Sequence, residues 1–360
     1  MARWALVVIA SATVFASAQD KQAIILVNHG VAQYDAGRYD EAVVYFKKAI
    51  EVEPDFLRAH DYLGTVLRAL EDYDGAVSSY RRATQIDPEF AAAHHNLALA
   101  LIDVGKPEEA ITSYRRALEL DPELPDGQKN LGLALQSVGE MELAVASLRA
   151  AIWEEPEDAV AQIALGAALL ELGRIDEAVA VYETAATLRP DFAPAQTNLG
   201  VALMRQGRSA DAVAAMRKVV VANPSNADAH LQLGLALSSA SQPTGARRAF
   251  RKAVEIDPEH AKAWLSLARE LEDPDEGVEA FRKAAALDPS SVQAHLGLGG
   301  LLLEQNHSTQ AADAFRSAIA LEPDNGEAHY YLSVSLDAAG NADEAREAKA
   351  EAERLGYELR

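Results

Sequence analysis

Five histidines recur at one position of a regular spacing, and histidine is a common metal ligand. They are His60, His94, His230, His295 and His329. Equivalent positions on neighbouring packed helices lie roughly 10 Å apart or more, whereas each ligand of one ion must reach within about 2 Å of it. We therefore interpret this position, which Trp264 also occupies, as a packing position and expect no metal site.

Other residue types that carry chemistry are missing from the sequence or lack the required spacing. The chain of 360 residues has no cysteine, which excludes disulfides, thiolate metal sites and a cysteine nucleophile. No phosphate-binding loop, dinucleotide glycine fingerprint, H-E-x-x-H, G-x-S-x-G or EF-hand pattern occurs. We expect no catalytic residues, no cofactor and no enzymatic activity.

A proline that recurs at a regular spacing divides the sequence into repeats, and these repeats predict the secondary-structure elements. The prolines of this series are separated by 34 residues, apart from one step of 31 residues between the eighth and its predecessor: Pro54, Pro88, Pro122, Pro156, Pro190, Pro224, Pro258, Pro289 and Pro323. With this proline as position 32, positions 8 and 20 always hold a small residue, as Gly64 and Ala76 do. The spacing predicts two antiparallel helices per repeat whose backbones approach where these small residues meet.

The turns inside and between the repeats are also marked in the sequence. Position 15 holds glycine in six repeats, where a positive φ can end the first helix: Gly37, Gly105, Gly139, Gly173, Gly207 and Gly340. The position-32 proline then ends the second helix. In the repeat of 31 residues, three residues are missing around 272–275, and we expect the stack to be distorted between its two helices.

The small residues at positions 8 and 20, alanine at 27, proline at 32 and an aromatic residue at 24 resemble the tetratricopeptide repeat family. The aromatic residues are Phe46, Tyr80, Tyr114, Tyr182, Phe250, Phe281 and Phe315. The resemblance implies an all-α fold, a right-handed α-solenoid superhelix of antiparallel helix pairs. It covers ten repeats within a single solenoid of residues 19–360 and leaves no room for a catalytic domain: 23–56, 57–90, 91–124, 125–158, 159–192, 193–226, 227–260, 261–291, 292–325 and 326–359.

The resemblance further implies that positions 2, 5, 6, 9, 12 and 13 of the first helices line a concave groove that binds polypeptides. The candidate peptide-binding residues are Asn28, Arg58, Tyr62, Asn96, Lys129, Asn130, Asn198, Arg205, Gln232, Lys262 and Arg269. The amides at position 6 could pair with the backbone of an extended peptide, because each offers donors and an acceptor. The alternative, that asparagine is simply common at position 6 in the family, stays open.

Basic pairs recur at positions 25 and 26 of the second helices, as in Arg81–Arg82 and Arg251–Lys252. We expect them to form a solvated face in which they pair with the acidic residues around them. The formal net charge of -22 provides no basic surface for a phosphate backbone, so we expect no nucleic-acid partner. We expect polypeptide ligands or protein complexes as partners, while the oligomeric state stays open.

The N-terminus has the pattern of a signal peptide over residues 1–18. A basic residue, Arg3, precedes an apolar run from Trp4 to Phe15, and the small residues 16–18 form a cleavage site that ends at Ala18. The run is shorter than the roughly 20 residues of a membrane-spanning helix. We expect a periplasmic or secreted protein that is not inserted in a membrane after cleavage, with an uncleaved anchor as the alternative.

The function that these observations favour is a non-catalytic scaffold that binds an extended or helical polypeptide and assembles an envelope or secreted complex. Two alternatives stay open at this point. The chain could recognise substrates for a separate enzyme such as a glycosyltransferase, or it could be a membrane-anchored assembly factor.

Overall fold

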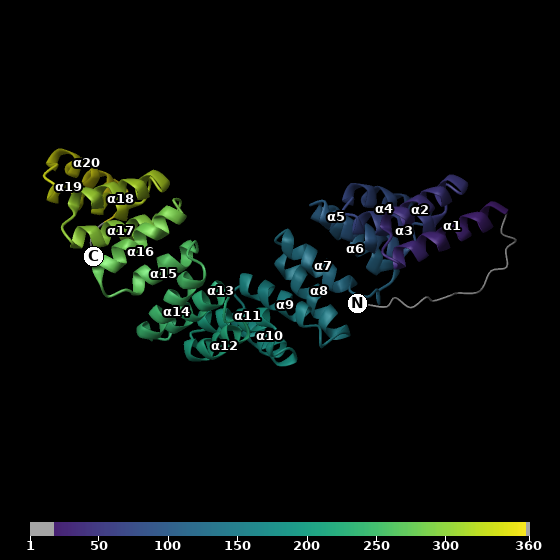
Figure 1. The fold of residues 1–360 in the computed structure, drawn as a ribbon, viewed down its shortest axis with the longest axis horizontal. Coiled ribbons are helices and arrows are strands. Elements are labelled where there is room, and N and C mark those ends of the chain that lie inside the picture. Colours follow the sequence, from purple (N-terminus) through teal and green to yellow (C-terminus); the bar gives the residue numbers. More distant parts are fainter. Residues whose placement is uncertain (1–17, 358–360) are drawn as a thin grey trace. The chain divides into compact units, whose positions relative to one another are not determined.

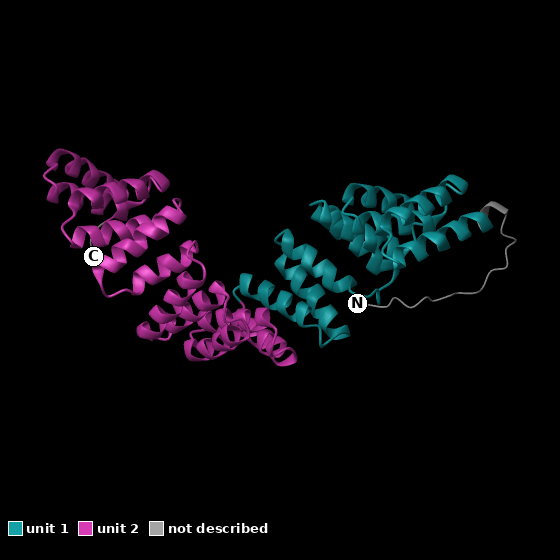
Figure 2. Cartoon of the chain, in the orientation of Figure 1, with its two compact units in different colours: residues 1–173 teal, residues 174–360 magenta. Residues whose placement is uncertain are grey.

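The computed structural model describes residues 18–357, and within this range every regular element is a helix (Figure 1). The expected signal peptide lies outside the described residues except for Ala18, the first residue of α1. The chain divides after Gly173 into two compact units, unit 1 and unit 2 (Figure 2). None of the helices in the described range is long and apolar enough to cross a membrane.

Unit 1 is a stack of helices in which each helix packs against the next one in the chain. First helices of neighbouring pairs also touch, as α1 and α3 do. The helices are α1 (Ala18–Asp35), α2 (Tyr39–Val52), α3 (Leu57–Ala69), α4 (Tyr73–Ile86), α5 (Ala91–Asp103), α6 (Pro107–Leu120), α7 (Gly127–Ser137), α8 (Met141–Glu154) and α9 (Ala159–Glu171).

Unit 2 continues with the same alternation, and its neighbouring helices pack in the same order. Its helices are α10 (Ile175–Leu188), α11 (Ala193–Arg205), α12 (Ser209–Ala222), α13 (Ala227–Ser239), α14 (Pro243–Ile256), α15 (Ala261–Glu270), α16 (Pro274–Leu287), α17 (Val292–Glu304), α18 (Ser308–Leu321), α19 (Gly326–Ala338) and α20 (Ala342–Arg354). Since each helix meets only near neighbours in the chain, the architecture is an α-solenoid.

The turn between the helices of a pair requires a left-handed residue at position 15. The six glycines predicted there have φ between 71° (Gly173) and 85° (Gly340), which confirms the prediction. Where the sequence lacks this glycine, Glu71, Ser241 and Asn306 adopt the same conformation with φ of 64°, 56° and 61°. A side chain in this region costs about 1 kcal/mol, so these turns are held by the packing of the helices on either side.

The helices of a pair approach closely at positions 8 and 20, as expected. A Cβ built on Gly132 would lie 3.4 Å from the backbone oxygen of Ala144, and one on Gly277 would lie 3.9 Å from that of Ala268. The alanines at position 20, such as Ala76, are fully buried.

The small residue at position 8 is also needed because a large side chain at position 24, often an aromatic ring, lies against its backbone. A Cβ built on Gly64 would lie 2.7 Å from the ring of Tyr80, and one on Gly234 would lie 2.3 Å from Phe250. Both rings are at position 24.

The short repeat also differs from the expectation that residues are missing between its helices. Helix α15 has 10 residues, where α13 and α17 have 13, while α16 keeps the usual 14. The deletion therefore removes most of the last turn of the first helix. Leu271 ends α15 in an extended conformation, with ψ of 136°, and the Asp273 side chain caps the start of α16.

Candidate functional site

The first helices of the pairs carry the predicted peptide-binding residues, on the surface that we call the first-helix face (positions 2, 5, 6, 9, 12 and 13). Five of these residues are exposed: Asn28, Arg58, Arg205, Lys262 and Arg269. Six are half-buried: Tyr62, Asn96, Lys129, Asn130, Asn198 and Gln232. The structure describes each unit separately, so the residues are brought together only within unit 1 or within unit 2.

Asn96 is bonded to the preceding repeat. Its Nδ2 atom on α5 donates to Oδ1 of Asp61 on α3 at 3.0 Å. Burial raises the pKa of the Asp61 carboxyl, and the hydrogen bond from Asn96 offsets part of that rise. The amide of Asn96 thus stabilises a half-buried acid and joins two first helices.

Asn130 makes the equivalent contact one repeat further on. Its Nδ2 atom lies 3.5 Å from Nε2 of His95, whose ring packs edge-on against Tyr114 with 5.4 Å between ring centroids. Burial lowers the pKa of His95, although the nearby Asp126 acts in the opposite direction. The asparagines of α5 and α7 therefore reach back to position 5 of the preceding repeat, a partner that the one-repeat pattern did not reveal.

The other position-6 amides differ from these two. Within residues 18–357, the side chains of Asn28, Asn198 and Gln232 make no hydrogen bond to another protein group. Their donors and acceptors are available to a ligand. The position-6 amides thus divide into those that join helices in unit 1 and those that make no protein hydrogen bond within the described part of the chain.

Two further predicted residues are partly engaged. Tyr62 stacks on Phe46, with 5.7 Å between ring centroids and 14° between ring planes, so that its ring belongs in part to the hydrophobic core of unit 1. Arg269 in unit 2 donates from Nη2 to Oε1 of Gln293 at 2.9 Å. Arg269 is nevertheless exposed, and a bond between exposed groups is easily exchanged for one to a ligand.

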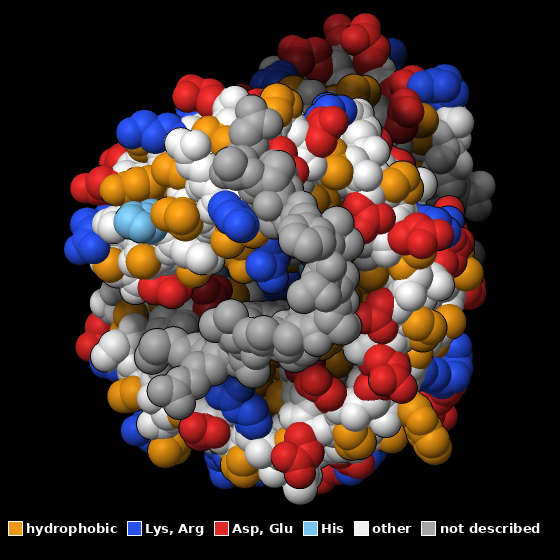
Figure 3. Space-filling model, turned by 90° about the vertical axis from the view of Figure 1, so that its right-hand side faces the viewer, with side chains coloured by type: hydrophobic (Ala, Val, Ile, Leu, Met, Phe, Trp, Pro, Cys, Tyr) orange, Lys and Arg blue, Asp and Glu red, His pale blue; other side chains and the backbone are white. Residues whose placement is uncertain are grey.

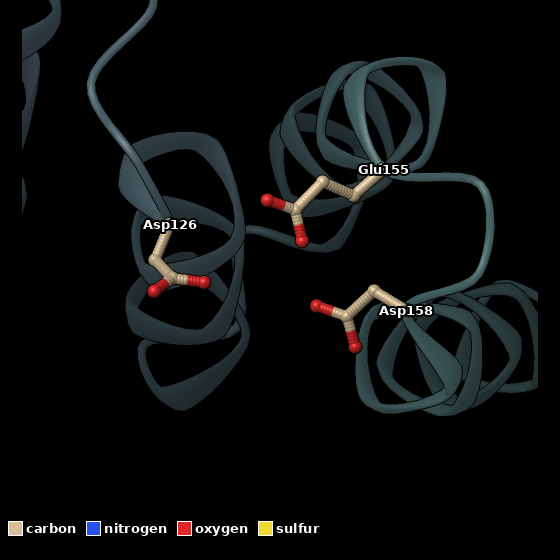
Figure 4. A group of neighbouring side chains, drawn as sticks. All are labelled: Asp126, Glu155 and Asp158. Atoms are coloured by element: carbon tan, nitrogen blue, oxygen red, sulfur yellow. The ribbon is translucent and has the colours of Figure 1, made fainter. Parts of the chain in front are cut away.

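Lys129 lies among three carboxylates that point toward one another from the ends of α7, α8 and α9 (Figure 4). Its Nζ atom is 2.5 Å from Oδ1 of Asp126 and 2.8 Å from Oδ2 of Asp158, and Glu155 completes the group. Burial lowers the pKa of Lys129, but the hydrogen bonds to both aspartates outweigh it and leave the pKa raised.

Asp158 has a second role in this cluster. Its Oδ1 atom caps α9 by accepting from the backbone N–H groups of Val160 at 2.8 Å and Ala161 at 3.1 Å. Burial would raise the pKa of Asp158, yet the bonds from Lys129 and from these amides lower it overall. Carboxylates in such an arrangement can bind a divalent cation, but here the ammonium of Lys129 already supplies the positive charge.

The recurring histidines bind the backbone. Nε2 lies 2.8 Å from the Pro54 carbonyl oxygen in His60, and the same contact to the preceding proline recurs at 3.1, 2.9, 3.2 and 3.0 Å for His94, His230, His295 and His329. A carbonyl can only accept, so Nε2 carries the hydrogen in each bond. Trp264 donates to Pro258 in the same way at 2.9 Å. Position 4 thus satisfies the carbonyl of the proline that ends the preceding repeat.

Three basic residues at position 25 pair with acids of the next repeat, as expected of a salt-bridged face. Arg81 lies 2.5 Å from Glu109, Arg251 lies 2.7 Å from Glu276, and the bond from Arg316 to Glu344 is 2.6 Å. Acidic and basic side chains are interspersed on the surface that Figure 3 shows. Each exposed pair contributes little to the folding stability, about 0–1 kcal/mol. These pairs therefore add little to the stability of the stack.

Comparison with protein-family models agrees with this architecture. Models of the tetratricopeptide repeat match residues 23–56 and, in overlapping segments, 129–196, 163–227, 197–261, 231–269, 262–306 and 301–356. A further model, described as TPR repeat, matches residues 64–105 and 100–139. The chain belongs to the tetratricopeptide repeat family, and its repeats are those of a protein–protein interaction scaffold.

A solved structure that aligns with most of this chain shares its fold. The Cut9–Hcn1 hetero-tetramer of APC/C aligns with 95% of this chain and 85% of the other, with 14% identity and a TM-score of 0.50. YrrB, described as a TPR protein with an unusual peptide-binding site, aligns with 54% of this chain and 100% of its own, with 24% identity and a TM-score of 0.48. MamA aligns with 44% of this chain and 94% of its own, with 23% identity and a TM-score of 0.42. None of the curated proteins matches the sequence.

Proposed function

We propose that this chain binds an extended or helical polypeptide along the first-helix face and thereby assembles an envelope or secreted complex. The observation that carries the proposal concerns the position-6 amides of Asn28 in unit 1 and of Asn198 and Gln232 in unit 2. Among the described residues, these amides have no hydrogen-bond partner in the protein. Exposed cations at neighbouring positions, such as Arg58 and Arg205, add contacts to carboxylate or carbonyl groups. The related YrrB is described as having a peptide-binding site, which is consistent with this use of the fold.

Free amides suit a polypeptide ligand for a physical reason. A peptide backbone presents N–H and C=O groups that must stay hydrogen-bonded when they leave water. A side-chain amide can bond both kinds of group, whatever the side chains of the peptide are. The exported location rests on the N-terminal sequence, in which an apolar run from Trp4 to Phe15 precedes the small residues that end at Ala18.

Site-specific photo-crosslinking tests the proposal. A photo-reactive residue is placed at Gln232 on α13 in one variant and at Glu183 on α10 in another, an exposed position on a second helix. Both are expressed in the host, and crosslinked products are identified by mass spectrometry from the envelope and secreted fractions. We expect polypeptide adducts from position 232 that position 183 does not give. Adducts from position 183 alone would contradict the proposal.

A further inference from the structure

One groove between second helices of unit 2 is much larger than the two equivalent grooves that follow it along the chain. Three grooves have equivalent linings: each lies between the second helices of consecutive pairs and has the first helix of the later pair as its floor. The groove between α16 and α18 has a volume of about 360 Å³, and the one between α18 and α20 about 280 Å³. The groove between α14 and α16 measures about 820 Å³.

The short first helix α15 explains the difference. It forms the floor of this enlarged groove, and its last turn is the one that the deletion removes. Leu271 stands in extended backbone at the point where Leu302 and Leu336 continue a helix in the other two grooves. The groove between α14 and α16 is therefore deeper, because its floor lacks the last helical turn.

Five of the eleven residues that line the enlarged groove are apolar: Val254 of α14, Trp264, Leu267 and Leu271 of the floor, and Ala280 of α16. Position 4 is Trp264 here, whereas the two smaller grooves have His295 and His329. An aromatic residue in a concave apolar surface is typical of a site that receives an apolar group of a partner.

The charges that line the enlarged groove are mainly negative. Four carboxylates, those of Glu255, Asp275, Glu276 and Glu279, stand beside two cations, Arg251 and Lys283. Arg251 is held by Glu276 at 2.7 Å. The pairs of Glu255 with Lys252 and of Glu279 with Arg282 are exposed pairs within one helix, which a ligand can replace at little cost. The lining, like the whole chain at -22, attracts a positively charged partner.

The walls of the groove favour a helical over an extended backbone in the bound segment. Both walls are helices, whose backbone groups are bonded internally, so they offer no edge to an extended strand. A strand would leave its own N–H and C=O groups unpaired against the apolar lining, which is costly. A helix enters with its backbone already satisfied. The wall from Asp275 to Lys283 extends for about 12 Å, enough for two turns.

We propose that the enlarged groove receives an amphipathic helix of a partner protein, with apolar side chains at i, i+3 or i+4 and i+7 in the groove and Lys or Arg side chains facing its carboxylates. This site is separate from the first-helix face, because none of its residues belongs to the peptide-binding positions proposed there. One surface can therefore be lost without the other.

The test uses the full chain and a fluorescently labelled model helix of leucine and lysine, with leucine at i, i+3, i+4 and i+7. Its affinity is measured by fluorescence anisotropy at physiological salt. Trp264→His makes position 4 the residue found in the two smaller grooves and keeps a donor for the Pro258 carbonyl. Glu279→Lys reverses a charge in the enlarged groove, and Glu347→Lys makes the same change at the equivalent exposed position of the smallest groove.

We expect Trp264→His and Glu279→Lys each to weaken binding at least tenfold, and Glu347→Lys to change it less than twofold. A peptide of the same apolar pattern with glutamate in place of lysine should bind at least tenfold more weakly than the lysine peptide. Equal losses in Glu279→Lys and Glu347→Lys would show that only the overall charge matters and would overturn the proposal. Unchanged binding by Trp264→His, with native circular dichroism, would overturn it as well, and so would an absence of binding to the unaltered chain.

Discussion

The side chain of Asn96 donates a hydrogen bond of 3.0 Å to the carboxylate of Asp61, 35 residues earlier in the chain. This bond joins α5 to α3 and assigns Asn96 to the stack itself. Asn198, at the same position three repeats later, makes no such bond within the described residues. Identical residues at position 6 thus have different tasks, and the difference can be measured.

Asn96→Ala should lower the stability of unit 1 by about 1–3 kcal/mol at neutral pH, because the half-buried Asp61 loses its donor. Asn198→Ala should change stability by less than about 0.5 kcal/mol. Urea unfolding followed by circular dichroism measures both. The deficit of Asn96→Ala should shrink in acid, because a protonated Asp61 needs the donor less. Equal effects of the two substitutions would contradict this division of tasks.

The non-glycine turns offer a way to stabilise the protein. Glu71→Gly should raise the stability by up to about 1 kcal/mol, since Glu71 is held at a φ of 64° that disfavours any side chain. Gly105→Glu makes the reverse change at the equivalent turn, where φ is 72°, and should lower stability by a similar amount. Thermal unfolding of both variants checks the pair, and a lower melting temperature for Glu71→Gly would refute the argument.

Two glycines of the first helices should respond in opposite ways to the same substitution. Gly234→Ala should destabilise unit 2 by about 1–3 kcal/mol, because the new Cβ would lie 2.3 Å from the ring of Phe250. Gly300→Ala should stabilise it by up to about 1 kcal/mol, because no atom lies within 4 Å of that Cβ and alanine favours the helix. Chemical denaturation distinguishes the two outcomes. A tolerated Gly234→Ala would mean that the ring at position 24 can move.

His95 should make the stability of unit 1 depend on pH. Its pKa in the folded chain is lowered from 6.5 by burial, so the folded state binds this proton less tightly than the unfolded state. The contribution of the neutral ring is complete above pH 6.5 and is lost as the pH falls toward the lower folded-state value. Asp61 acts in the opposite sense, since its raised pKa removes stability as the pH rises above 3.8.

The variant His95→Gln isolates the histidine contribution, because it leaves Asp61 unchanged. We expect the unaltered chain to lose stability relative to His95→Gln when the pH is lowered through 6.5. Denaturation midpoints at a series of pH values give this difference. Parallel curves for the two proteins would show that His95 does not titrate differently on folding.

Much of the architecture follows from the sequence because the signals lie within one repeat. The proline of position 32, as in Pro54, and the glycine of position 15, as in Gly105, each act on a turn that their own neighbours form. The small residues at positions 8 and 20 were also apparent, but the additional contact of position 8 with the side chain at position 24 was not. The spacing of apolar residues predicts which faces of two helices pack together. It does not predict how deeply a side chain of one helix packs against the backbone of the other.

The contacts that define the candidate site were less predictable, since they join different repeats. Asp61 and His95 stand at position 5, and only the stacking of first helices brings them to the asparagines of the next repeat. The sequence signal for these contacts was a polar residue at position 5 that lies 35 residues before an asparagine at position 6. The enlarged groove is likewise a consequence of stacking, because the loss of one turn in α15 opens a space between two other helices.

The central claim, that the first-helix face binds polypeptides through its free amides, is tested most directly by a comparative pull-down. Residues 19–360 are used as bait against the envelope and secreted fractions of the host, in the unaltered form, as Asn198→Ala with Gln232→Ala, and as Arg81→Ala with Arg316→Ala on the second helices. Quantitative mass spectrometry then compares the captured proteins. We predict that a defined set of partners is lost from the amide variant and retained by the arginine variant. Equal retention by both variants, with native helicity, would contradict the account.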